Sequence, residues 1–246
     1  MNNPVIKELI EKPITIDRPG DQSMRLEKER KEIVAFGRKL LTSGLTAGTG
    51  GNLSVINRKN KVIAITPSGV DYFEMSPEDV VLVGTEGGPV ETSRYKPSSE
   101  LLFHQALYRR REDIQAIVHT HSVYATTLAT LGWEIPAFHY LVAYSGKKVP
   151  LAAYATFGSE RLARNVADAI GENNAVLMGS HGVVTVGPTL AKAFEAAEII
   201  EYVARVYYLA KNLGEPAILS DEEMDKVIEK FRAYGKSRQD KTGNGR

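Results

Sequence analysis

The chain has 246 residues, of which 43% are hydrophobic, with 31 basic side chains, 30 acidic side chains and no cysteine. This length supports one large domain with a sizeable core, and a formal net charge of +1 gives no overall field that would hold nucleic acid or an acidic membrane. The lack of cysteine excludes disulfides, thiolate metal ligands and a cysteine nucleophile, so any metal must be bound by His, Asp or Glu.

The N-terminal part of the chain shows little hydrophobic periodicity and is interrupted by three prolines and a glycine. We therefore expect an extended arm over residues 1–22, a single folded domain over residues 23–235 and a polar C-terminal tail over residues 236–246. The start of the chain has charges where a signal peptide needs an apolar stretch, and no run approaches the roughly eighteen apolar residues of a membrane span. These features predict a soluble, cytoplasmic protein.

Segments with helical and strand periodicity alternate along the predicted domain. Helices are expected over residues 25–43, 96–110, 122–131, 158–170, 190–213 and from about 221 to 234. Strands are expected within residues 53–55, 62–66, 79–84, 113–121 and 149–156 and in two halves of 175–187. No linker or change of composition interrupts this order, which is typical of one α/β domain with a central sheet covered by helices.

Two histidines stand one residue apart at the end of the apolar stretch "QAIVHTHS". Because side chains alternate between the two faces of a strand, His119 and His121 are expected to project to the same side. A catalytic zinc ion typically has three protein ligands and one open position, and His181 in "GSHGVV" is a candidate for the third ligand. The competing interpretation is a pair of solvated histidines at the end of a strand.

Glu100 is expected in the first turn of the helix that follows "KPSS". It could simply stabilise the positive end of the helix dipole, or it could act as a general base beside the metal. Ser98 and Ser99, with the free N–H groups at the helix start, could form an ordinary N-cap or a phosphate site. His104 lies four residues after Glu100 on the same helical face, so this pair is a competing ligand set.

The glycine-rich stretch "AGTGGNLS" follows a helix and precedes a strand. A Rossmann fingerprint needs the reverse order, and a P-loop needs a Gly-Lys-Ser/Thr ending that is absent here. Nucleotide binding is therefore unsupported. Exposed N–H groups in such a turn could still hold a small anion, and an ordinary connecting loop is the alternative.

Eight stretches occur in a fixed order over about residues 25–236: "TGGNLS", "ITPSG", "KPSSELLFH", "AIVHTHS", "IPAFHY", "YATFG", "SHGVV" and "LSDEEMDKVIEKFRAYG". Together they resemble the class II aldolase family of sugar phosphates, and within it the L-fuculose-phosphate aldolases most closely. The resemblance implies a three-layer α/β/α fold with a central mixed, largely antiparallel sheet. It also implies a homotetramer with active sites between subunits.

The resemblance implies a role for each candidate residue. It implies that a catalytic Zn²⁺ ion is bound by His119, His121 and His181. Glu100 would carry out the proton transfers and serve as an extra ligand when substrate is absent, Tyr140 would reach a neighbouring subunit's site, and Tyr234 would act near the C-terminus. It implies that the substrate phosphate is bound by Thr49, Gly51, Asn52, Ser68, Gly69, Ser98 and Ser99.

The implied activity is cleavage of a ketose 1-phosphate, of the L-fuculose 1-phosphate type, to dihydroxyacetone phosphate and an aldehyde through a zinc-stabilised enediolate. A methylthioribulose-1-phosphate dehydratase and another ketose-phosphate aldolase are alternatives within the same superfamily. An L-ribulose-5-phosphate 4-epimerase is less favoured because residues 135–150 contain no acidic residue. An adducin-head-like interaction domain is disfavoured because such domains lack the zinc ligands.

A Schiff-base aldolase that uses Lys147 or Lys148 is a further alternative. Nothing in the sequence around these lysines suggests the apolar pocket that would lower a lysine pKa.

Overall fold

The computed structural model describes residues 24–233, so the predicted arm, the predicted tail and Tyr234 lie outside the described residues. Its strands are β1 (Asn52–Asn57), β2 (Val62–Ile65), β3 (Val81–Gly84), β4 (Ala116–Thr120), β5 (Leu151–Ala152), β6 (Ala175–Met178) and β7 (Gly182–Gly187). They form one seven-stranded sheet in the order β3-β2-β1-β4-β7-β6-β5. All neighbours are antiparallel except the parallel pair β5 and β6. The predicted mixed, largely antiparallel sheet is therefore confirmed.

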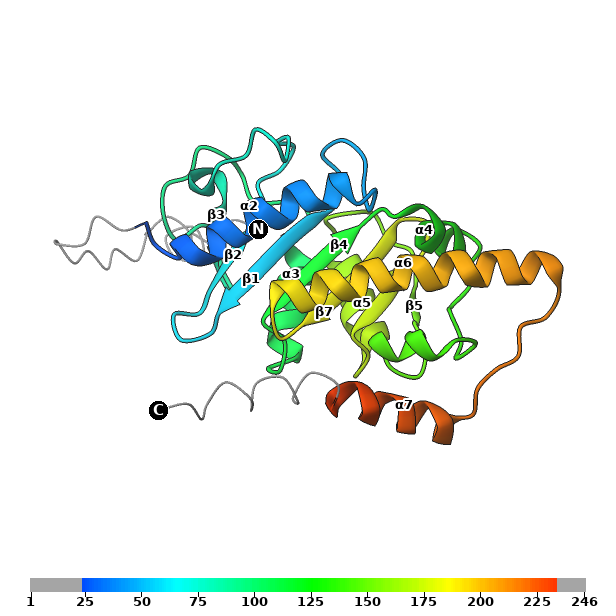
Figure 1. The fold of residues 1–246 in the computed structure, drawn as a ribbon. Helices are drawn as coiled ribbons and strands as arrows, with labels where there is room; N and C mark the ends of the chain where they lie inside the picture. The colour runs from blue at the N-terminus through cyan, green and yellow to red at the C-terminus, as the bar shows by residue number, and fades with distance from the viewer. Residues whose placement is uncertain (1–23, 234–246) are drawn as a thin grey trace, which may run out of the picture.

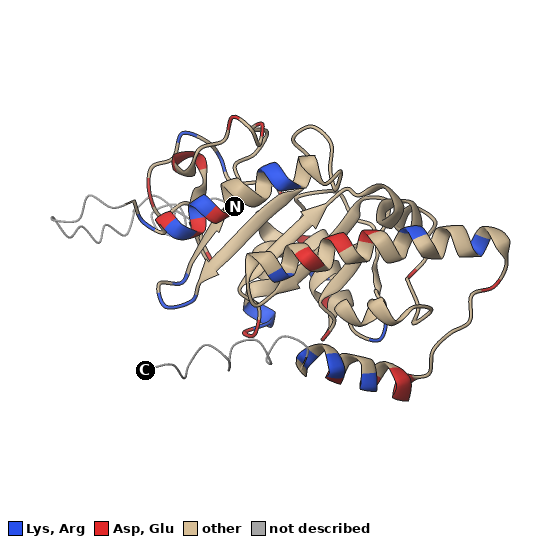
Figure 2. Ribbon diagram, in the orientation of Figure 1, with Lys and Arg blue, Asp and Glu red and all other residues tan. Residues whose placement is uncertain are grey.

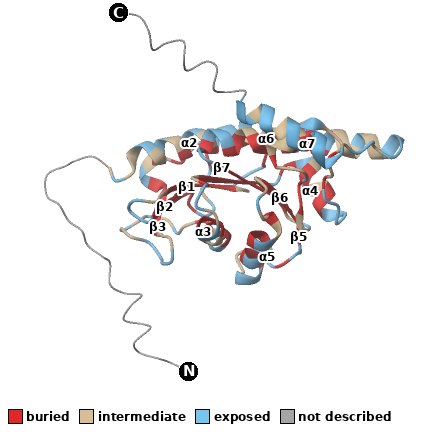
Figure 3. Cartoon of the chain, turned by 90° about the horizontal axis from the view of Figure 1, so that it is seen from below, coloured by how far each residue is buried: buried red, intermediate tan, exposed pale blue. Residues whose placement is uncertain are grey.

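Helices cover both faces of this sheet. The helices are α2 (Glu27–Thr42), α3 (Leu101–Arg110), α4 (Val123–Thr130), α5 (Glu160–Ile170), α6 (Leu190–Leu213) and α7 (Asp221–Ala233), with short 3-10 helices η1 (Pro77–Asp79) and η2 (Tyr140–Tyr144). Figure 3 shows α3 and α5 below the sheet and α2 and α6 above it, with α4 at its β6 side. In Figure 1, α7 follows α6 after a long connection and lies beside η2. This arrangement confirms the predicted three-layer α/β/α fold.

Alternating side chains of the strands bury both faces of the sheet. In β2, Ile63 and Ile65 pack in the core shared with α3 and α5, whereas Val62 and Ala64 pack in the core shared with α2 and α6. A sheet covered on both faces has no solvent-facing positions for charged side chains, so its strands are mostly apolar, and polar strand residues such as Ser54 and Thr185 are buried. Figure 2 accordingly shows the lysines, arginines and acidic residues on helices and loops, with none on the strands.

Two expected boundaries differ from the structure. The strand expected over 149–156 is reduced to Leu151–Ala152, because Pro150 has no N–H to donate and the chain leaves the sheet edge after Ala152. The helix expected over residues 96–110, with Ser98 or Ser99 near its N-cap, begins at Leu101, with Glu100 at the N-cap position instead of the first turn. The Ser98 hydroxyl accepts a hydrogen bond from the Glu100 N–H and forms a turn before the helix. None of the helices within residues 24–233 is both long and apolar enough to cross a lipid bilayer.

Candidate metal centre and active site

The middle of the sheet positions the first two histidines. His119 is the second-last residue of β4 and pairs with Asn52 of β1 on one side and with Val184 of β7 on the other. It is fully buried, because strands flank it on both sides. His121 follows one residue after the end of β4, and its Nε2 atom lies 3.0 Å from Nε2 of His119. The two imidazoles therefore converge as the alternation of side chains predicts.

A tight turn between β6 and β7 brings in the third histidine. His181 lies in the three-residue connection between these strands and donates its backbone N–H to the Met178 carbonyl at 3.0 Å. Ser180, just before it, has a φ of 50°, a left-handed conformation that non-glycine residues seldom adopt. A Cβ atom at Gly182 would overlap the Thr120 carbonyl oxygen and crowd His119 and His121. The turn can reach the other histidines only because residue 182 is glycine.

Glu100 completes a compact cluster with the three histidines. Its Oε2 atom lies 3.1 Å from Nε2 of His119, and its Oε1 atom lies 3.3 Å from Nε2 of His181. The four ligand atoms of Glu100, His119, His121 and His181 all lie within 4.8 Å of one another. The N-cap position explains this placement, because the Glu100 side chain makes no capping hydrogen bond and points to the histidines instead.

The hydrogen bonds of the cluster fit a bound cation. His119 donates its Nδ1–H to the Val183 carbonyl at 3.0 Å, so the lone pair of its Nε2 atom faces the Glu100 carboxylate. Two lone-pair acceptors that face each other in a buried site repel unless a proton or a cation lies between them. In addition, Oε1 of Glu100 is buried and receives no hydrogen bond from any of the residues that the structure describes. Three imidazole nitrogens and a carboxylate oxygen are a donor set suited to zinc and similar divalent ions.

The surroundings favour the protonation states that bind metal. Burial, with a smaller contribution from His119, lowers the pKa of both His121 and His181 to about 4, so both are neutral near pH 7. Burial acts to raise the pKa of the Glu100 carboxyl. Attraction to positive charge on His119 and His181, together with the hydrogen bond from Asn52, outweighs burial and holds that pKa well below the usual range. Neutral imidazoles beside an ionised carboxylate are the ligand forms that a divalent cation requires.

A cavity of about 340 Å³ opens beside the cluster. Its lining includes all seven predicted phosphate-binding residues, Thr49, Gly51, Asn52, Ser68, Gly69, Ser98 and Ser99, together with Glu100, His121 and His181. None of the described residues that line it is lysine or arginine. An anion here would be held by hydroxyl and backbone N–H groups and by the N-terminal end of α3, where the helix dipole favours negative charge.

The glycine-rich loop is held against the cluster by a residue that the sequence did not single out. Gly51 has a φ of 72°, and a Cβ atom there would lie 2.6 Å from the His119 carbonyl oxygen, so only glycine fits this approach. The Tyr72 hydroxyl donates to the Gly51 carbonyl at 2.9 Å. Burial, followed by the charge of Glu100, raises the pKa of Tyr72, so the phenol stays a donor. Tyr72 lies about twenty residues from this loop, and no local pattern links the two.

One of the two predicted catalytic tyrosines, Tyr140, is not part of this assembly within one chain. Tyr140 is 50% exposed on η2 and does not line the cavity of its own chain. Its ring stacks on His139 at 4.9 Å and on Phe231 at 6.2 Å between centroids. Tyr234 lies outside the described residues. Their catalytic roles therefore stay predictions.

His104, considered above as a competing ligand, is directed away from the cluster. It is fully buried, and both of its ring nitrogens have other partners, Ser54 Oγ at 2.7 Å and Asn52 Oδ1 at 2.5 Å. The helical spacing of Glu100 and His104 is as predicted, but the helix begins only after Glu100, so the two side chains do not converge on one point.

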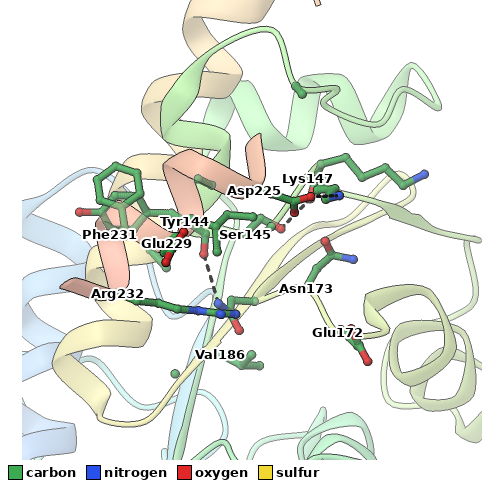
Figure 4. A pocket seen from close by; sticks show the side chains of 18 of the residues that line it. Tyr144, Ser145, Lys147, Glu172, Asn173, Val186, Asp225, Glu229, Phe231 and Arg232 are labelled. Atoms are coloured by element: carbon green, nitrogen blue, oxygen red, sulfur yellow. Dashed lines mark hydrogen bonds and ion pairs between the residues drawn. The ribbon is translucent and has the colours of Figure 1, made fainter. Parts of the chain in front are cut away.

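Another cavity, of about 1420 Å³, lies between η2 and α7 and is shown in Figure 4. Lys147 at its edge lies 2.9 Å from Asp225, and Lys148 lies 2.7 Å from Glu134. The hydrogen bond with Asp225 raises the pKa of Lys147, which keeps the amine protonated. A Schiff-base lysine must lose its proton, so this geometry disfavours a Schiff-base mechanism. The larger cavity is thus not the better catalytic candidate.

The fold and the site together define an α/β protein built around a cluster of three histidines and a glutamate, beside a cavity of about 340 Å³. The family "Class II Aldolase and Adducin N-terminal domain" matches residues 31–208. The chain therefore belongs to the class II aldolase and adducin N-terminal domain family, which confirms the resemblance seen in the sequence.

Individual relatives agree with this assignment. The chain is 49% identical over 212 residues to a 5-deoxy-D-ribulose 1-phosphate aldolase of Bacillus thuringiensis, covering 86% of this chain and 99% of the relative. It is 41% identical over 214 residues to a 5-methylthioribulose-1-phosphate/5-deoxyribulose-1-phosphate aldolase of Rhodospirillum rubrum. The match covers 85% of this chain and 94% of that relative. A solved structure named L-fuculose 1-phosphate aldolase matches with a TM-score of 0.83 and 45% identity, covering 86% of this chain and all of that chain.

Proposed function

We propose that this protein is a divalent-metal-dependent aldolase that cleaves a ketose 1-phosphate to dihydroxyacetone phosphate and an aldehyde. The observation that carries the proposal is the cluster of Glu100 and three histidines beside a cavity lined by hydroxyl and N–H groups. The three relatives described above carry aldolase names that differ in the sugar phosphate. Zn²⁺ is the proposed ion, held by His119, His121 and His181.

The ion, when bound, supplies Lewis acidity to the carbonyl and hydroxyl oxygens of the substrate. The hydroxyls of Ser98 and Ser99 and the N–H groups of the glycine loop bind the substrate phosphate and so fix the position of the reacting carbons. The C3–C4 bond breaks, its electron pair stays on C3, and the C4 hydroxyl passes its proton by way of Tyr140 of a neighbouring copy to solvent as it becomes the aldehyde. Glu100, which takes up a proton from solvent, delivers it to C3, which yields dihydroxyacetone phosphate.

We propose a 5-deoxyketopentose 1-phosphate, such as 5-deoxyribulose 1-phosphate, as the preferred substrate class. The dihydroxyacetone phosphate half is common to the substrates named for all three relatives, so only the aldehyde half differs between them. Tyr154 and Phe157 line the cavity and are 57% and 65% exposed. Two aromatic rings at the mouth favour an apolar substituent such as a methyl or methylthio group on the aldehyde.

Tyr140 is proposed to act on the aldehyde oxygen in the site of a neighbouring copy within a homotetramer. This proposal is supported by its 50% exposure and by its absence from the cavity lining of its own chain. Tyr234 is proposed to act at the same site from the C-terminal end.

The test is release of dihydroxyacetone phosphate from 5-deoxyribulose 1-phosphate, 5-methylthioribulose 1-phosphate and L-fuculose 1-phosphate, each with a chelator and after addition of Zn²⁺. The expected result is chelator-sensitive release, fastest with the first two compounds. Loss of water from the methylthio compound without release of dihydroxyacetone phosphate would assign the protein to the dehydratase branch instead. Equal release with and without chelator would reject the metal mechanism.

A further inference from the structure

A chain of buried polar side chains runs from the core between β1 and α3 to the Glu100 carboxylate. Tyr108 lies 2.8 Å from Ser54 Oγ, Ser54 Oγ lies 2.7 Å from Nδ1 of His104, and Nε2 of His104 lies 2.5 Å from Oδ1 of Asn52. Nδ2 of Asn52 lies 3.0 Å from Oε2 of Glu100. Sequence spacing does not reveal this chain, because its members come from a strand and a helix about fifty residues apart.

The direction of each hydrogen bond follows from chemistry. The Asn52 amide can only donate to the ionised carboxylate of Glu100, so its oxygen faces His104 and must accept. His104 therefore carries its proton on Nε2, and Nδ1 accepts from the Ser54 hydroxyl. From Ser54 onward, every donor in the chain is thus oriented toward Glu100, whereas the Tyr108 hydroxyl also lies 3.0 Å from the Ser54 carbonyl oxygen, to which it can donate. Burial lowers the pKa of His104 to about 3, which keeps this imidazole neutral with a single N–H.

The two oxygens of Glu100 are consequently not equivalent. Oε2 is fixed by Asn52 and lies 3.1 Å from His119. Oε1 lies 3.3 Å from Nε2 of His181 and accepts no hydrogen bond from residues 24–233, although it is buried and belongs to a residue that lines the cavity. A carboxylate held by one oxygen leaves the other free for proton transfer at a fixed position.

We propose that His104 is a positioning residue that acts through Asn52 to fix Oε2 of Glu100 and leave Oε1 as the oxygen that carries the proton. This inference rests on the proposed function, because it assigns the proton transfer to Glu100. His104 touches neither the substrate cavity nor the metal cluster, since its two nitrogens are both used within the chain.

The test uses a half-reaction in which Glu100 is the only proposed proton-transfer group, exchange of the hydroxymethyl hydrogen of dihydroxyacetone phosphate with D₂O. The C–H bond breaks, the electron pair moves onto the carbonyl, the proton goes to Oε1, and a deuteron returns after exchange with solvent. His104→Phe keeps a planar ring but removes both nitrogens. We expect exchange to fall about 10- to 100-fold, with zinc content and binding of dihydroxyacetone phosphate unchanged.

Three comparison variants separate positioning from a general structural effect. His104→Gln retains an N–H that can donate to Asn52, so it is expected to recover most of the exchange rate. Tyr108→Phe removes only the far end of the chain and is expected to cost at most about fivefold, the value of one neutral hydrogen bond. In a Glu100→Gln background, His104→Phe is expected to cause no further loss, because residues that act through one another are not additive.

A crystal structure of the His104→Phe variant provides a readout independent of turnover. The expected result is a Glu100 carboxylate rotated away from Asn52, with the three histidines unmoved. An unmoved Glu100, or additive losses in the double variant, would overturn the inference while leaving the proposed function intact. If the wild-type protein releases no dihydroxyacetone phosphate but Glu100 is displaced in the His104→Phe structure, the positioning role of His104 stands and the proposed function is rejected.

Discussion

Of the two cavities described above, the smaller has the lining better suited to catalysis. The larger, of about 1420 Å³, lies under α7 and is lined by exposed charged side chains such as Lys147, which pairs with Asp225. The smaller, of about 340 Å³, lies among the loops at the ends of the middle strands and adjoins a buried carboxylate and three clustered histidines. Exposed ion pairs are solvated and nearly satisfied, whereas buried lone pairs that converge on one point call for a ligand. The electrostatic state of the lining, and not its volume, locates the chemistry.

The largest effect is expected when a ligand of the small cavity is removed. His121→Ala should abolish stoichiometric zinc binding and reduce dihydroxyacetone phosphate release by about a thousandfold or more, because metal polarisation contributes several kcal/mol to such reactions. Metal analysis and steady-state kinetics measure both quantities. Lys147→Met in the large cavity is the control and should leave both unchanged. A His121→Ala protein with full zinc and full activity would contradict the assignment.

The next effect separates proton transfer from metal binding. Glu100→Gln should retain zinc but lose roughly 10²- to 10⁴-fold in kcat, the usual range for a missing acid or base. Glu195→Gln is the matched control and should have a kcat close to that of the wild type. Glu195 lines the large cavity, and its carboxylate accepts hydrogen bonds from Tyr144 and Lys192. Near-normal turnover by Glu100→Gln would remove this residue from the mechanism.

The pH dependence of the free energy of unfolding should show the contribution of His104, the buried histidine behind the small cavity. His104 has an ordinary pKa near 6.5 when unfolded and about 3 when folded, so below pH 6.5 the unfolded state binds a proton that the native state does not. Stability is therefore lost as the pH falls from 6.5 toward 3. Between pH 7 and 4.5 the metal-free wild type should lose about 2 to 3 kcal/mol more than metal-free His104→Gln, as measured by urea unfolding. Equal losses would mean that His104 does not stay neutral in the folded protein.

A smaller, purely steric effect is expected at the turn that carries His181. Gly182→Ala should lower the free energy of unfolding by about 1 to 3 kcal/mol, because its Cβ overlaps the Thr120 carbonyl oxygen in a packed region. Gly87→Ala is the control, since a Cβ there has no neighbour within 4 Å. Chemical denaturation of the two variants compares them directly. Equal stability of the two variants would show that the turn can shift without cost.

The sequence predicted the architecture better than the connections within the site. Periodicity placed α6 at Leu190–Leu213, and strand alternation brought His119 and His121 to one side. The three-layer arrangement came from the family resemblance. Spacing alone could not choose between His104 and His181 as partners of the histidine pair, because that choice depends on where a helix begins and on which strands pair. Tyr72 and the hydrogen-bond chain through Asn52 were missed for the same reason, since long-range contacts leave no local pattern.

The most direct test of the metal centre is anomalous X-ray diffraction from crystals of the zinc-loaded protein, recorded on both sides of the zinc absorption edge. We expect one strong anomalous peak per chain, about 2.0 to 2.1 Å from the Nε2 atoms of His119, His121 and His181. A peak among the carboxylates of the large cavity, or none at the three histidines, would contradict the account.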